Sequence, residues 1–246
     1  MTRAGIDEVG RGSIAGPVVV CALAFRLGAD PALVAMLRDS KLLSSARRAN
    51  LATRLLEHAY IGLAAASAPV IDRLNIRRAT HRAMRQALAR LERICPTPID
   101  EVVIDGHESP NPNDRRLRPL IKADAQIPEV SGAAIVAKVL RDRLMERLDR
   151  RWPGYRWAAN AGYPSPAHKT ALLRLGPTPH HRRSFAPVRA LIAPKPCSID
   201  DSSEQEARSS AHRTEVSRTY GITAQAQSSF LTTAISDEQG GRHQRA

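Results

Sequence analysis

Four acidic residues stand at or near the ends of short apolar segments in this chain. Asp7 and Glu8 are adjacent in the first segment, Asp105 closes another, and Asp124 follows a third. Clustered carboxylates bind hard divalent cations through oxygen. Two such cations can activate water and stabilise the leaving oxygen in phosphodiester cleavage. The pattern therefore favours a metal-dependent phosphodiesterase site, while Asp105 and Asp124, each taken alone, also fit a turn or helix-capping role.

The adjacent pair sets a geometric condition. Two carboxylates inside an apolar strand are costly unless they are paired or bound to a metal. Strand alternation points Asp7 and Glu8 to opposite faces. To share a metal site they must lie at the end of the strand or at a local distortion. The alternative is one exposed and one partly buried acid with no metal.

A glycine-rich loop follows the acidic pair directly. Gly10 and Gly12 would let backbone N–H groups approach a phosphate or a sugar closely. Arg11 between them could hold a phosphate. The alternative is an ordinary tight turn.

Length and charge restrict the class of protein. The chain has 246 residues, of which 43% are apolar, so a folded domain with a proper core is expected. The 37 Lys and Arg residues outnumber the 24 Asp and Glu residues, for a net charge of +13. This balance indicates a polyanionic partner, most often nucleic acid, or else an arginine-rich solvated surface.

Several features indicate a cytoplasmic protein with no membrane segment. The longest apolar stretches fall far short of the roughly 20 residues that cross a bilayer. No apolar run follows Arg3, so a secretory signal is not expected. Cys21, Cys95 and Cys197 are odd in number and widely spaced, which suits a reducing compartment rather than a disulfide framework. No oligomerisation motif is visible, so we expect a monomer.

The composition changes near residue 195. Residues 195–246 are rich in Ser, Gln, Thr and Ala and carry six basic and seven acidic residues. Such a segment cannot bury enough apolar surface to offset its ordering entropy. We therefore expect a catalytic domain over residues 1–194, which holds the excess basic charge, and a largely disordered tail over 195–246.

Apolar periodicity predicts an α/β domain with a mixed central sheet of about five strands flanked by helices. The predicted strands cover residues 5–9, 17–25, 60–68, 101–105 and 117–122. The predicted helices cover residues 45–58, 71–94, 131–150 and 166–175. Side chains expected to pack rather than react are Cys21, Trp152, Tyr155 and Trp157, whereas His107, His168, His180 and His181 are expected to be partly exposed.

Residues 6–19, which begin Ile6-Asp7-Glu8-Val9-Gly10-Arg11-Gly12, resemble the opening motif of the bacterial type 2 ribonuclease H family, ribonuclease HII. Further blocks resemble the family in the same order, at residues 39–44, 71–76, 104–106, 122–125, 135–142 and 176–185. The resemblance covers roughly residues 5–190. It implies an RNase H-like fold and metal-dependent endonucleolytic cleavage of RNA in RNA–DNA hybrids, including single ribonucleotides in duplex DNA, with 3′-hydroxyl and 5′-phosphate products.

The resemblance also implies roles for individual residues. Asp7, Glu8, Asp105 and Asp124 become the catalytic carboxylates that bind Mn²⁺ or Mg²⁺, with Asp7 bridging two ions. Gly10, Arg11 and Gly12 become the loop that reads the ribose 2′-OH, the group that distinguishes RNA from DNA. Lys41 becomes a phosphate contact, and Tyr163 resembles the tyrosine that packs on the deoxyribose past the ribonucleotide. Arg182 and Arg183 are either contacts to the nucleic-acid backbone or a solvated pair.

Two departures from the family pattern support an alternative. Ala123 stands where the family usually has Gly, and Ala134 stands where it usually has Ser. The alternative is a degenerate, non-catalytic protein that binds hybrids, although the four acids are intact. A further alternative is a structure-selective DNA nuclease on the same fold, such as a junction resolvase. The loop at residues 10–12 and Tyr163 suit a ribose rather than a DNA junction.

Overall fold

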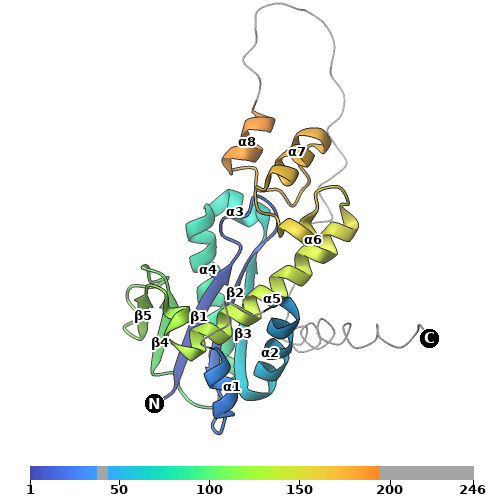
Figure 1. The fold of residues 1–246 in the computed structure, drawn as a ribbon. Helices are drawn as coiled ribbons and strands as arrows, with labels where there is room; N and C mark the ends of the chain where they lie inside the picture. The colour runs from blue at the N-terminus through green and yellow to red at the C-terminus, as the bar shows by residue number, and fades with distance from the viewer. Residues whose placement is uncertain (38–43, 194–246) are drawn as a thin grey trace, which may run out of the picture.

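A computed structural model describes residues 1–37 and 44–193. In this part of the chain, five strands form one mixed sheet in the order β3-β2-β1-β4-β5 (Figure 1). Its strands are β1 (Arg3–Val9), β2 (Val18–Phe25), β3 (Ala59–Ala66), β4 (Glu101–Asp105) and β5 (Leu117–Leu120). β2 is antiparallel to β1 and β3, whereas β4 is parallel to β1 and β5. The predicted α/β architecture is confirmed.

Helices cover both faces of the sheet. They are α1 (Pro31–Met36), α2 (Ser45–His58), α3 (Ala68–Leu74), α4 (Ile76–Ile94), η2 (Ala123–Ala125), α5 (Pro128–Arg151), α6 (Trp157–Asn160), α7 (Pro166–Leu175) and α8 (Ala186–Ile192). The single helix predicted over residues 71–94 is wrong, because Asn75 breaks it. Asn75 has a φ of 67°, and its side chain caps α4 by accepting a hydrogen bond from Arg78 N at 3.0 Å.

Alternation along β2 divides the core into two layers. Cys21 and Leu23 pack with residues of α2 and α5 on one face. Ala22 and Ala24 pack with residues of α4 on the other face. The Cys21 thiol is fully buried, as its apolar strand predicts. The sheet is therefore covered on both sides, which holds the carboxyl ends of β1 and β4 in fixed positions.

Helix α5 lies unusually close to β1 at Gly5. A Cβ atom on Gly5 would lie 2.2 Å from the backbone nitrogen of Val130, so only glycine fits there. Because the start of α5 is pressed against β1, the short η2 segment just before it is held close to the same strand. This contact sets the distance between the first and last acidic segments.

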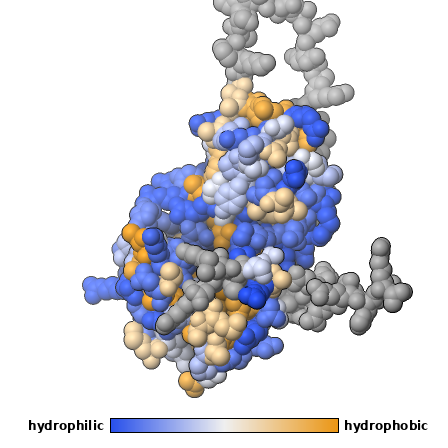
Figure 2. All heavy atoms as spheres, in the orientation of Figure 1, coloured by the Kyte–Doolittle hydropathy of each residue, from blue (hydrophilic) through white to orange (hydrophobic). Residues whose placement is uncertain are grey.

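Helices α6, α7 and α8 lie beyond one end of the sheet (Figure 1). Trp157 and Tyr155 are buried there against Met145 and Leu148 of α5, with Trp152 partly buried beside them. The predicted packing role of these aromatic residues is confirmed. The visible face is largely hydrophilic, with several small apolar patches, one of them at the end of the molecule that carries α7 and α8 (Figure 2). Within the described ranges, no helix has the length and apolarity needed to span a bilayer.

Candidate active site

Three of the four acids belong to one face of the sheet. Asp7 is opposite Cys21 in the register of β1 and β2, on the face that α5 covers. Asp105 ends β4, the strand parallel to β1, and Asp124 lies in η2. Glu8 is opposite Val20, on the face that α4 covers, one residue before β1 ends. The adjacent pair thus diverges as alternation requires, at the end of the strand.

Hydrogen bonds fix the turn that carries Asp124. The backbone N–H of Ala123 donates to Asp105 Oδ1 at 2.8 Å. Ser131, in the first turns of α5, places its hydroxyl 2.6 Å from the carbonyl oxygen of Asp124. The left-handed residue of this turn is Lys122, with a φ of 58°, and Ala123 needs no positive φ. Alanine at position 123 is therefore compatible with the turn.

The site concentrates negative charge in a largely buried position. Burial raises the pKa of Asp7 well above its ordinary value, and the neighbouring Glu8, Asp105 and Asp124 raise it further. Burial also raises the pKa of Glu8, while Arg11 opposes that effect. Glu8 Oε2 is buried and has no hydrogen-bond partner among the residues that the structure describes. Such oxygens are poorly stabilised by the protein alone.

This donor set fits a divalent cation. Carboxylate oxygens are the preferred ligands of Mg²⁺ and Mn²⁺, and a cation would compensate the repulsion around Asp7. Among residues 1–37 and 44–193, no three His, Cys, Asp or Glu side chains are already arranged to hold one ion. Binding therefore requires these side chains to turn toward a common point.

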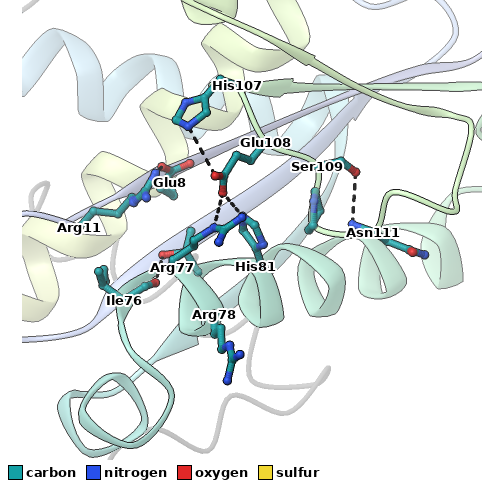
Figure 3. Close-up of polar contacts among 12 residues, drawn as sticks. Glu8, Arg11, Ile76, Arg77, Arg78, His81, His107, Glu108, Ser109 and Asn111 are labelled. Carbon is teal, nitrogen blue, oxygen red and sulfur yellow. Dashed lines mark hydrogen bonds and ion pairs between the residues drawn. The ribbon is translucent and has the colours of Figure 1, made fainter.

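Positive side chains surround the Glu8 side of the site. Arg11 Nη1 lies 3.1 Å from Glu8 Oε1 (Figure 3). On the loop after β4, Glu108 Oε2 lies 2.6 Å from Arg77 Nε and 3.4 Å from His81 Nε2 of α4. Arg77 holds the pKa of Glu108 below its ordinary value. The loop that leaves Asp105 is thereby tied to α4.

Two buried arginines hold the glycine-rich loop from behind. Arg182 is fully buried and donates to the carbonyls of Gly10, Arg11 and Gly16 at 2.7, 2.8 and 3.0 Å. Arg141, also buried, donates to the hydroxyl of Ser13 at 2.8 Å. The structure thus places Arg182 inside the protein, whereas a surface contact to nucleic acid requires exposure. Arg182 is buried because its N–H groups supply hydrogen bonds to backbone carbonyls of the loop, which would otherwise be buried without a donor.

The two glycines of the loop differ in how much room they leave for a side chain. Gly10 has a φ of 97°, and a Cβ atom there would lie 2.0 Å from Arg141 Nε. Gly12 differs, because a Cβ atom there would meet only Tyr163 Cε1, at the ordinary contact distance of 3.6 Å. Tyr163 itself is 41% exposed. The structure therefore brings the loop and Tyr163 together from distant parts of the chain.

Other predicted residues lie elsewhere. Arg183 is exposed, and Lys41 lies outside the described residues. The expectation that His168 and His181 are partly exposed is wrong, because they are 0% and 1% exposed. Sequence reasoning also missed Arg141, for which the only signal is a charged residue inside the apolar run of α5.

Comparison with known proteins agrees with this arrangement. The family model described as Ribonuclease HII matches residues 4–188. The chain belongs to the ribonuclease HII family. It is 48% identical over 188 residues to the ribonuclease HII of Cereibacter sphaeroides, an alignment that covers 76% of this chain and 85% of that protein. As a member of this family the protein is a ribonuclease H, a hydrolase that acts on RNA–DNA hybrids.

Solved structures show the same fold. The ribonuclease H2 of Pyrococcus horikoshii matches with a TM-score of 0.63 and 24% identity, covering 78% of this chain and 97% of that one. A Bst ribonuclease HIII in complex with Mn²⁺ matches with a TM-score of 0.62 and 22% identity, covering 77% of this chain and 68% of that one. At these identities the likeness establishes the RNase H-like fold.

Proposed function

We propose that this ribonuclease HII family member nicks duplex DNA on the 5′ side of embedded ribonucleotides. It also hydrolyses the RNA strand of RNA–DNA hybrids, and both reactions leave 3′-hydroxyl and 5′-phosphate ends. The observation that carries the proposal is the approach of Gly12 to Tyr163 next to the strand that bears Asp7. A loop that can admit a ribose and a ring that can pack on the next sugar are thus adjacent to the candidate metal site.

The reaction depends on a divalent ion, Mn²⁺ or Mg²⁺, held by Asp7, Glu8, Asp105 and Asp124. When bound, two ions supply an activated water and stabilise the departing oxygen. The proposal is supported by the buried Glu8 Oε2, which has no hydrogen-bond partner within residues 1–37 and 44–193, and by the raised pKa of Asp7. It is also consistent with the Mn²⁺ complex of the related ribonuclease HIII.

The protein's own groups select and orient the substrate. Backbone N–H groups of residues 10–12 approach the 2′-OH and the phosphates beside it, because no side chain stands at Gly12. The Arg11 side chain is 47% exposed, so its guanidinium can donate to a phosphate of the substrate. The Tyr163 ring favours a sugar without a 2′-OH, which explains selection of a ribonucleotide followed by DNA.

The experiment uses a labelled DNA duplex that carries one ribonucleotide, with Mg²⁺ or Mn²⁺. An all-DNA duplex, a four-way DNA junction and the Asp7→Asn variant serve as controls. Metal-dependent nicking 5′ of the ribonucleotide, absent from the controls, is expected. Binding without cleavage by the wild type in either metal would support the non-catalytic alternative. Cleavage of the DNA junction instead would support a structure-selective DNA nuclease.

A further inference from the structure

A chain of buried hydrogen bonds ends on the backbone of Tyr163. The N–H of Thr178 lies 3.0 Å from His181 Nδ1. His181 Nε2 lies 3.2 Å from His168 Nε2, and His168 Nδ1 lies 2.8 Å from the carbonyl oxygen of Tyr163. The chain thus links the loop before α8 to the residue beside Gly12.

The partners at the two ends determine where the protons are. Because Thr178 N–H can only donate, His181 Nδ1 accepts, and the ring proton of neutral His181 is on Nε2. Because the Tyr163 carbonyl can only accept, His168 carries its proton on Nδ1. The single lone pair of His168 Nε2 is then shared by two donors, His181 Nε2–H at 3.2 Å and Trp157 Nε1–H at 3.0 Å. Each assignment is consistent with the other, so the chain has one direction, from Thr178 to Tyr163.

Both imidazoles are held in the neutral form. Burial lowers the pKa of His168, and burial together with the neighbouring His168 and His180 lowers the pKa of His181 to about 3. A second proton on His168 would face the Trp157 N–H at Nε2. The hydrogen bond from His168 to Tyr163 is therefore present throughout the neutral pH range.

The rest of the Tyr163 segment is fastened to the glycine-rich loop. Gly162 O accepts from the N–H groups of Ile14 and Ala15, at 2.9 and 3.3 Å. Arg141 donates to the Ala161 carbonyl at 2.9 Å. At Tyr163 the carbonyl accepts from the nearby Ser165 N–H, at 2.8 Å, and from His168. His168 is thus the side chain that ties this carbonyl to the buried aromatic cluster.

We propose that His168, supported by His181, is a positioning residue that fixes the Tyr163 ring at the sugar 3′ to the ribonucleotide. It sets the selectivity of the enzyme for ribonucleotides followed by DNA without touching the substrate. The inference rests on the proposed function, because it assigns the partner of Tyr163. It assigns His168 a role distinct from filling the core beside Trp157.

Two substitutions at His168 separate these roles. His168→Asn keeps an N–H donor at the position of Nδ1, within reach of the Tyr163 carbonyl, but leaves the ε position empty. His168→Gln keeps the volume and a polar group facing Trp157 and His181, but lacks the donor to Tyr163. Thr170→Asn, an exposed position on the same helix, is the matched control, and Tyr163→Ala defines complete loss of the ring.

The first readout is the ratio of cleavage rates on a single-ribonucleotide DNA duplex and on a uniform RNA–DNA hybrid. This ratio should be about tenfold lower in His168→Gln than in the wild type, since a displacement of about 1 Å can cost up to about 100-fold in rate. His168→Asn and Thr170→Asn should stay within about twofold of the wild type. A core-filling role predicts the reverse order, with the smaller Asn more harmful than Gln.

The second readout needs no substrate. Hydrogen exchange at the amides of residues 161–163 and of Ser165 should accelerate in His168→Gln and stay slow in His168→Asn, because exchange reports local opening. If Gln retains both the slow exchange and the rate ratio, the positioning role is overturned. If the wild type nicks no ribonucleotide while exchange still separates Asn from Gln, the proposed function fails and the role of His168 in holding Tyr163 stands.

Discussion

Arg182 donates a hydrogen bond to the carbonyl oxygen of Gly10 at 2.7 Å, from a side chain that is fully buried. The same guanidinium reaches the carbonyls of Arg11 and Gly16. Its planar fork thus closes the turn that follows the acidic strand. Burial and the nearby Arg141 lower the pKa of Arg182 to about 9, so the guanidinium still carries its charge at neutral pH. It lies with Arg141 beneath a loop that we propose to contact phosphates. The arrangement both shapes the loop and gives it positive potential.

The first prediction concerns this fork. Arg182→Lys should lower the free energy of unfolding by about 2–4 kcal/mol, because the single ammonium nitrogen cannot reach the carbonyls that Arg182 meets from separate nitrogens, and a buried partner is left unpaired. Nicking activity should fall with it, since the loop loses its support. Chemical denaturation and the nicking assay measure the two effects.

The neighbouring arginine provides the control. Arg183 is exposed, so Arg183→Lys should leave the free energy of unfolding within about 0.5 kcal/mol of the wild type. Equal stability of Arg182→Lys and the wild type would contradict the supporting role of Arg182.

The second prediction separates the two glycines of the loop. Gly12→Ala should fold with the stability of the wild type, because the new methyl group meets only Tyr163 at an ordinary distance. It should reduce nicking by at least about tenfold, since the methyl group takes the space that we assign to the ribose. Gly10→Ala should instead destabilise the protein, by about 1–3 kcal/mol from its φ of 97° alone. Thermal unfolding and the nicking assay, run on both variants, distinguish blocked binding from lost structure.

The third prediction concerns the loss of stability that the buried acidic cluster causes in the metal-free protein. Asp7→Asn should raise the Tm of the metal-free protein, because a neutral amide avoids both the cost of burying a charge and the repulsion from the other acids, the two effects that raise the pKa of Asp7. Each kcal/mol corresponds to about 2–4 °C for a domain of this size. Nicking should fall by more than roughly 100-fold, beyond the effect of residues that only support metal ligands.

Metal addition tests whether Asp7 is a metal ligand. Mn²⁺ should raise the Tm of the wild type, because an ion that binds the folded state stabilises it. The Asp7→Asn variant should respond much less. An equal rise in Tm in both proteins would show that Asp7 is not a metal ligand.

Local patterns were sufficient to predict much of the fold. The strand over residues 101–105 and the helices over 45–58 and 166–175 agree with the structure, because apolar spacing and capping residues are local signals. The break at Asn75 escaped prediction, since a single left-handed residue leaves the apolar spacing on either side unchanged. Helical periodicity continued through it and indicated one long helix.

The site was less accessible to local reasoning. The acids could be selected from their places at strand ends, whereas the approach of Tyr163 to Gly12 depends on the packing of α5, α6 and α7. Arg182 next to Arg183 has the pattern of a solvated pair, and its true partners are backbone carbonyls, which have no sequence signature. The buried histidines were missed for the same reason, because their partners are one another and the main chain.

The last prediction is the pH dependence of stability that His181 confers. Its pKa is lowered from 6.5 to about 3 in the folded protein by burial, His168 and His180. Between these values the unfolded chain binds a proton that the folded protein does not, so protonation favours unfolding. The contribution of neutral His181 is complete above pH 6.5 and is lost as the pH falls toward 3, by up to about 1.4 kcal/mol per pH unit.

His181→Asn isolates this effect, because its amide oxygen can accept from Thr178 N–H yet does not titrate. At pH 7 the variant should be less stable than the wild type by about 1–2 kcal/mol, for the lost hydrogen bond to His168. Because the wild type loses up to about 1.4 kcal/mol per pH unit below 6.5, the two unfolding free energies should become equal between about pH 5 and 6, and the variant should be the more stable protein at pH 4. His107→Asn, at a side chain 74% exposed, should follow the wild type throughout. Parallel curves for His181→Asn and the wild type would show that His181 gains a proton at the same pH in the folded protein as in the unfolded chain, and that burial does not hold it neutral below pH 6.5.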